Sequence, residues 1–177
     1  MIHLIGSKKT INILCVIAVI LVIVVGILYV VGILSSVSSK LKDFSIDKLS
    51  TEDIIHKEIS TVVGSSINYE SDTRTGFDGA SKYEDSDRVE FKCDKITGIK
   101  RISATKVSDC TLTISISSKL SSGKAKIVVI CDNEILEYVD VGQDLSFTYK
   151  ITGEHFYSVK VLCEDAALEI AVNRVVS

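Results

Sequence analysis

Four cysteines in the C-terminal part of the chain come closest to forming a chemical site: Cys93, Cys110, Cys131 and Cys163. Their spacings of 17, 21 and 32 residues include no close pair, whereas a zinc site usually combines two close pairs. Each cysteine falls on an apolar position of an expected strand or in an apolar run. Because unpaired cysteine is among the most buried residue types, this pattern favours four buried thiols.

A disulfide is the alternative use of these thiols, because an even number of cysteines permits complete pairing in an exported domain. Cys131 and Cys163 both end apolar strands, so a Cys131–Cys163 bridge is expected if those strands are neighbours. Such a bridge would add about 2–4 kcal/mol of stability if its geometry is unstrained. The sequence leaves both possibilities open.

Glu154 and His155 are the pair that could perform acid–base chemistry, and they stand at an expected turn. A turn that opens a strand explains them equally well. The chain has no Gly-x-Ser-x-Gly elbow, no His-Glu-x-x-His helix and no glycine-rich phosphate loop. We therefore assign no catalytic, cofactor-binding or metal-ligating residue, and we expect neither a cofactor nor an enzyme.

An acidic segment over residues 65–88 is the other polar region that could bind a ligand. Its carboxylates do not match the EF-hand register, in which oxygen ligands alternate around a glycine at the sixth position. We interpret it as a solvated loop. Its aromatic residues Tyr69, Phe77 and Tyr83 are our candidates for contact with a partner.

The elements that must position these residues begin with an apolar run over residues 11–34, which follows a short tail over residues 1–10. Residues 13–34 carry no charge and would be roughly 33 Å long as a helix, close to the ~30 Å core of a bilayer. A cleaved signal peptide normally has an apolar core of only about 7–15 residues. We therefore expect a retained, single-pass transmembrane helix (a signal anchor), with cleavage in the following serine cluster as the alternative.

Charge around this run gives a nearly balanced positive-inside signal, because lysines both precede and follow it. Long domains are translocated across the membrane largely regardless of their charge. We therefore expect a cell-membrane protein with an extracytoplasmic C-terminal domain. After residue 39 the chain holds 18 of its 20 basic residues and all 23 acidic residues, a net charge of −5. This acidity argues against nucleic acid as a partner.

A juxtamembrane connector over residues 35–88 is expected to contain one short amphipathic helix over residues 51–63. Ser50 and Asp53 have the spacing of a capping box, and Gly64 suits the end of the helix. From residue 89 the apolar period changes to two, which indicates strands. The expected strands cover residues 89–93, 99–107, 110–116, 127–130, 135–141, 145–151, 157–163 and 168–172.

About eight short strands without intervening helices predict a mainly β domain over residues 89–177. An apolar sheet face must be buried on another sheet, so we expect an antiparallel β-sandwich, with a small β-barrel as the alternative.

About 50 residues near the C-terminus resemble a bacterial family. They begin at the Ser122–Gly123 turn, include the strand that follows Gly153 and contains Tyr157, and end with the short final strand. The family comprises small, functionally uncharacterised β-sandwich surface proteins that are membrane-anchored in Gram-positive bacteria. The resemblance covers about 50 residues and contains no functional motif. It implies an exported bacterial domain and no particular activity.

These observations predict a membrane-anchored, non-catalytic binding or interaction module of the bacterial cell envelope. Its partners would be the lipid bilayer, through residues 11–34, and a protein or a cell-envelope polymer. Two alternatives stay open: a structural or assembly subunit of a membrane complex, and a hydrolase whose site is assembled from dispersed residues.

Overall fold

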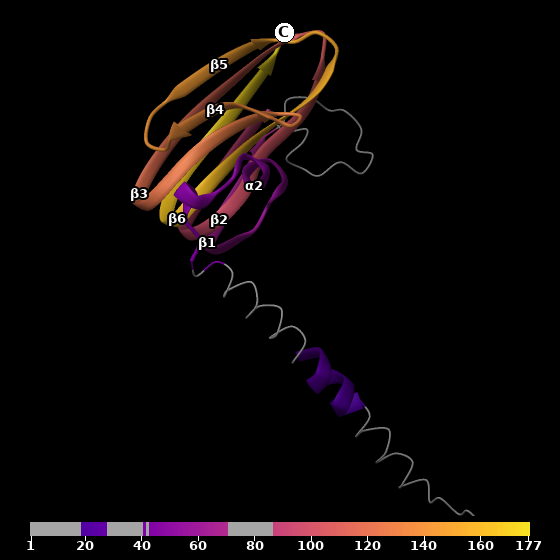
Figure 1. The fold of residues 1–177 in the computed structure, drawn as a ribbon, viewed down its shortest axis with the longest axis vertical. Helices are drawn as coiled ribbons and strands as arrows, with labels where there is room; N and C mark the ends of the chain where they lie inside the picture. Colours follow the sequence, from indigo (N-terminus) through magenta and orange to yellow (C-terminus); the bar gives the residue numbers. More distant parts are fainter. Residues whose placement is uncertain (1–18, 28–40, 42, 71–86) are drawn as a thin grey trace, which may run out of the picture. The chain divides into compact units, whose positions relative to one another are not determined.

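The computed structural model describes residues 19–27, 41, 43–70 and 87–177, without the side chains of residues 69 and 70 (Figure 1). The chain divides into two compact units, Met1–Asp43 and Phe44–Ser177.

The expected transmembrane helix over residues 11–34 is not supported by the first unit. Its described helical backbone covers residues 19–27. Among the described residues, no helix is long and apolar enough to cross a membrane. That part of the fold prediction is therefore wrong, and the remainder of the expected span lies outside the described residues.

The second unit opens with the 3-10 helix η1 (Ile46–Lys48) and the helix α2 (Thr51–His56). The predicted capping box is confirmed: the Asp53 amide donates to Ser50 Oγ at 3.1 Å, and the Ser50 amide donates to Asp53 Oδ2 at 3.1 Å. The helix was predicted to continue to residue 63, but strand β1 (Ser60–Glu70) begins instead. Its β-branched residues pair with the next strand, a use that suits them better than helix.

Five further strands complete the sheet: β2 (Arg88–Ser108), β3 (Thr111–Cys131), β4 (Glu134–Asp140), β5 (Leu145–Lys150) and β6 (Glu154–Val176). All pairings are antiparallel, in the order β1-β2-β6-β3-β4. β5 also pairs with β3, beside residues 111–116, whereas β4 lies beside residues 126–131. The mainly β, antiparallel prediction is confirmed, but the sheet begins at Ser60 and not at residue 89.

The strand count was wrong because three pairs of predicted strands are continuous. The register shifts within β2, β3 and β6, at positions such as Cys93–Ile96 and Leu120–Ser122, without ending the strands. Bulges of this kind bend a strand and increase its twist. The sequence shows each bulge as a break in the two-residue period, which we interpreted as a turn.

The bends fold the sheet back on itself (Figure 1). Tyr149 of β5 pairs beside Leu112, and Tyr157 of β6 pairs beside Cys131, at opposite ends of β3. A straight strand would separate those ends by roughly 60 Å. The two tyrosine rings nevertheless lie with centroids 5.5 Å apart. Two halves of one sheet therefore face each other, an arrangement that fits the β-sandwich prediction.

The main core lies between these two halves. Its fully buried members include Phe91, Ile116, Ile127 and Leu168. A second cluster lies on the outer face, where Ile46 and Ile54 of η1 and α2 pack with residues such as Leu162.

Lys160 fastens α2 to this outer face. The side chain is 3% exposed, and its Nζ donates to the carbonyls of Ile54 at 3.2 Å, Ile55 at 2.7 Å and Lys57 at 3.2 Å. These are carbonyls at the C-terminal end of the helix, which have no partner within it. A buried cation thus completes the hydrogen bonding of a six-residue helix.

All four described cysteines are free, so the Cys131–Cys163 bridge considered above is not formed. In the β3–β6 ladder Cys131 pairs with Tyr157, whereas Cys163 pairs with Ala125, six positions away. Six strand residues span about 20 Å, and a disulfide needs Cα atoms within about 7 Å. The prediction of four buried thiols is half correct: Cys93 and Cys163 are buried, whereas Cys110 and Cys131 are only half-buried. Burial raises the pKa of Cys163 to about 12.

Candidate functional site

The first candidate site is a group of three residues at the β3–β4 turn, Cys131, Asp132 and His155, which we name the turn cluster. Cys131 ends β3, and Asp132 follows it with φ 49°, a left-handed conformation that redirects the chain. The Asp132 amide donates to the Phe156 carbonyl at 2.8 Å. This bond holds the turn beside the first residues of β6, and His155 is one of them.

The donor atoms of the turn cluster converge. His155 Nδ1 lies 2.8 Å from Asp132 Oδ2, and Cys131 Sγ lies 4.0 Å from the same oxygen. One donor atom from each of Cys131, Asp132 and His155 lies within 4.8 Å of the other two. The cluster combines three residue types that bind transition metals.

Two members of the turn cluster are also held by neighbouring groups. His155 Nε2 lies 3.2 Å from the Thr152 carbonyl, and the Phe156 amide donates to Asp132 Oδ1 at 2.9 Å. Cys131 pairs beside Tyr157 in the β3–β6 ladder. The Asp132 and His155 side chains are therefore oriented before any ligand arrives.

Electrostatics in the turn cluster do not produce an activated cysteine. Burial raises the pKa of Cys131, although the hydrogen bond from Tyr157 opposes this effect. The Asp132 carboxylate raises the pKa of His155, and the Phe156 amide followed by His155 lowers the pKa of Asp132. A protonated thiol beside an imidazole–carboxylate pair lacks the thiolate that nucleophilic catalysis needs.

Glu154 and His155, which we considered as a possible acid–base pair without assigning them a role, do not pair with each other. Glu154 Oε1 instead accepts from Lys106 Nζ at 2.8 Å, while His155 bonds Asp132, 23 residues earlier in the chain. Sequence reasoning missed Asp132 because its position opposite His155 depends on the β3–β6 register. The one available signal was the Asp132–Asn133 turn directly after a cysteine.

The three aromatic residues predicted to contact a partner differ in how far the structure describes them. Phe77 and Tyr83 lie outside the described residues, and Tyr69 is described only as backbone within β1. Tyr69 therefore belongs to a strand and not to the loop that we expected.

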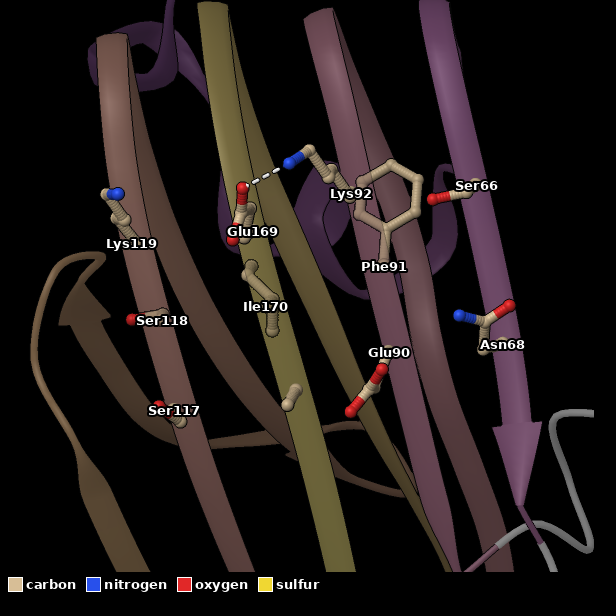
Figure 2. A pocket seen from close by; sticks show the side chains of 11 residues that line it. Ser66, Asn68, Glu90, Phe91, Lys92, Ser117, Ser118, Lys119, Glu169 and Ile170 are labelled. Atoms are coloured by element: carbon tan, nitrogen blue, oxygen red, sulfur yellow. Dashed lines mark hydrogen bonds and ion pairs between the residues drawn. The ribbon is translucent and has the colours of Figure 1, made fainter.

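A second candidate site lies on the outer face of the sheet, where a hollow of about 330 Å³ crosses four strands (Figure 2). We name it the outer hollow. Two rows of residues that are neighbours across the strands β1, β2, β6 and β3 line it. One row is Ser66–Lys92–Glu169–Lys119, and the other is Asn68–Glu90–Ala171–Ser117.

Charges of both signs alternate along the first row of the outer hollow. Lys92 Nζ lies 2.5 Å from Glu169 Oε1, and Lys119 lies on the next strand. The contact between Lys92 and Glu169 is the dashed line in Figure 2. Lys92, followed by Lys119, lowers the pKa of Glu169. Exposed pairs of this kind contribute little stability, so a ligand can replace either partner at low cost.

Strand β1 borders the outer hollow and forms one edge of the sheet. Within the described ranges β1 pairs with β2 alone, so one row of its backbone N–H and C=O groups has no strand partner there. Residues 60–69 contain no charge and no proline. Edge strands are usually protected by charges, as β4 is by Glu134, Glu137 and Asp140. Along β1 the one charged residue is Glu70, at its end, so residues 60–69 lack such protection.

Comparison with known proteins identifies no family. No protein-family model matches the chain, and no curated protein sequence matches it. Among solved structures it is similar in part to the secreted serine protease VesC from Vibrio cholerae, at 10% identity and a TM-score of 0.36. That similarity covers 76% of this chain but 27% of VesC, so the chain spans about a quarter of that protein. A TM-score this low supports no conclusion about fold or activity.

Proposed function

We propose that the chain is a non-catalytic protein-interaction module that binds an extended polypeptide segment by strand addition at β1. The observation that carries the proposal is the uncharged edge of β1 beside the outer hollow. The proposal retains the binding role expected from the sequence, without the membrane anchor.

Strand addition divides affinity and specificity between two sets of groups. Backbone hydrogen bonds to the edge strand provide affinity, and alternate side chains of the added strand provide specificity. Those side chains would lie next to Ser66 and Asn68, which line the outer hollow from β1. Beyond them lie Lys92 and Glu90 on β2, so a segment that carries both an acidic and a basic residue suits the surface.

An assembly role would use the same edge, with β1 of a second copy as the added strand. Residues 60–69 of β1 carry no charge, so they can pair antiparallel with their own copy without repulsion between like charges. The two roles predict different oligomeric states of the purified protein in solution. The assembly role predicts a dimer, and binding of a foreign peptide does not require one.

Selection from a random-peptide display library on the immobilised full chain tests the proposal. A selected peptide should bind roughly tenfold more weakly, about 1.4 kcal/mol, to Val63→Lys, because a lysine on the edge strand opposes pairing. Val63 is 61% exposed, so the substitution should be tolerated in the fold. Ser146→Lys on β5 is the matched control and should bind the peptide as wild type does.

Two results would count against strand addition at β1 to a foreign peptide. One is a selected peptide that binds Val63→Lys as tightly as wild type. The other is a wild-type dimer in analytical ultracentrifugation that Val63→Lys converts to a monomer, which would favour the assembly role.

A further inference from the structure

We propose that the turn cluster is a zinc site, with Cys131 Sγ, Asp132 Oδ2 and His155 Nδ1 as its ligands. Zinc accepts thiolate, imidazole and carboxylate donors, and these three atoms come from two segments that the β3–β6 ladder holds side by side. The proposal is independent of strand addition at β1.

The separations between the donor atoms suit a tetrahedral ion. Bond lengths of about 2.0–2.3 Å around a tetrahedral zinc place its donors roughly 3.3–3.7 Å apart. In the structure Nδ1 and Oδ2 are 2.8 Å apart and Sγ and Oδ2 are 4.0 Å apart. Each of the three residues has one donor atom within 4.8 Å of a donor atom of both others. Shifts of about 1 Å in these side chains would therefore bring all three atoms to bonding distance.

The neighbouring groups are those that a metal site needs. A metal-ligating histidine usually donates its other ring N–H to a carbonyl or a carboxylate, and His155 Nε2 faces the Thr152 carbonyl at 3.2 Å. This contact leaves Nδ1 as the nitrogen that faces the other two donors. The Phe156 amide holds the second oxygen of Asp132, and the β3–β6 ladder places Cys131 beside Tyr157.

Charge also balances in the loaded site. If Cys131 binds as a thiolate, Asp132 as a carboxylate and His155 as a neutral imidazole, the ligands carry a total charge of −2. One Zn²⁺ neutralises this charge. The thiol proton, and the Nδ1 proton where the imidazole is charged, pass to solvent. Three protein ligands leave a fourth position for water. The ion would clamp the β3–β4 turn to the start of β6.

Titration of the reduced, chelator-treated full chain with Co²⁺ tests the proposal, because a cobalt–thiolate site has an intense near-ultraviolet charge-transfer band. We expect one Co²⁺ per chain with this band and displacement of the Co²⁺ by Zn²⁺. Cys131→Ser should abolish the band, and His155→Gln should weaken binding at least roughly tenfold, the loss of about 1.4 kcal/mol of binding. Zn²⁺ should raise the Tm of the wild type but not that of Cys131→Ser.

Cys110→Ser is the matched control, because Cys110 is also a half-buried free thiol but is not part of the turn cluster. It should retain both the band and the Zn²⁺-dependent rise in Tm. A circular dichroism spectrum of each metal-free variant establishes that it has folded.

Three results would overturn the proposal: absence of the thiolate band in the wild type, a band that survives in Cys131→Ser, or unchanged affinity in His155→Gln. In that case the Asp132–His155 hydrogen bond serves only to fasten the turn.

Discussion

Replacement of Lys160 by methionine tests whether a buried cation holds α2 on the sheet. Methionine retains the apolar stem of lysine but removes the ammonium that donates to three carbonyls of residues 54–57. The substitution also removes the ion pair with Glu58, whose Oε1 lies 3.7 Å from Lys160 Nζ. Glu58 keeps a partner in the variant, because its Oε1 lies 2.7 Å from Arg101 Nε. The loss of stability is therefore expected to come mainly from the three bonds between Lys160 and the end of α2.

The expected loss follows from two opposing contributions. Three hydrogen bonds from a charged donor, at the lower limit of about 1.5 kcal/mol each, contribute roughly 4–5 kcal/mol. Burial of the ammonium opposes them, and it is the main cause that lowers the pKa of Lys160. If relief of that burial recovers about half of the loss, Lys160→Met should lower the free energy of unfolding by about 2–3 kcal/mol.

Urea unfolding of the full chain, followed by circular dichroism, measures this loss. With a slope of about 1–3 kcal/mol per molar urea, the midpoint should fall by roughly 0.7–3 M. Lys106→Met is the control, because its ion pair with Glu154 is exposed, with side chains 63% and 65% accessible. It should change stability by less than about 0.5 kcal/mol.

Hydrogen exchange provides an independent readout. In Lys160→Met the amides of α2 should exchange faster than those of the central strands, because the helix has lost its attachment. Equal or greater stability of Lys160→Met would refute the reasoning, since the cation would then cost at least as much as its bonds return.

Three other predictions concern glycine, cysteine and acid stability. Gly98→Ala should destabilise the fold by about 1–3 kcal/mol more than Gly142→Ala in thermal unfolding. Both have φ +119°, but only at Gly98 would a Cβ meet a backbone carbonyl, at 2.0 Å. In the native chain Cys110 should react with a thiol reagent much faster than the buried Cys163, and equal rates would contradict the described burial. Burial raises the pKa of Glu164, but hydrogen bonds from Ser45 and Ile46 outweigh it and lower the pKa. The ionised Glu164 therefore stabilises the folded chain above its unfolded pKa, near 4.5, and this stabilisation is lost as the pH falls. The stability difference between wild type and Glu164→Gln should therefore shrink below about pH 4.5, and a constant difference would contradict this assignment.

The sequence predicted local features of the second unit well. The capping box at Ser50 and the apolar parity of the strands depend on neighbours within a few residues, and both were correct. The end of the helix was not, because Val62 and Val63 pair with residues 95 and 96 of β2. Pairing of this kind overrides local helical spacing, and one sequence does not reveal it.

The candidate sites could not be predicted from the sequence, because they too depend on pairing between strands that are distant in the chain. Asp132 and His155 meet only because β3 and β6 adopt one particular register, and a shift by one residue would place them on opposite faces. The outer hollow likewise requires four strands in an order that the chain does not follow. Side-chain types were visible in the sequence, whereas their neighbours were not.

The position of β6 in the sheet has a consequence for synthesis of the chain. β6 is the last strand in chain order, yet it lies between β2 and β3 and pairs with both along most of its length. While the ribosome still holds residues 154–176, the long strands β2 and β3 have no shared neighbour, and their apolar faces stay exposed. We expect the sheet to close only after release of this segment, so nascent chains should be aggregation-prone and dependent on chaperones until then.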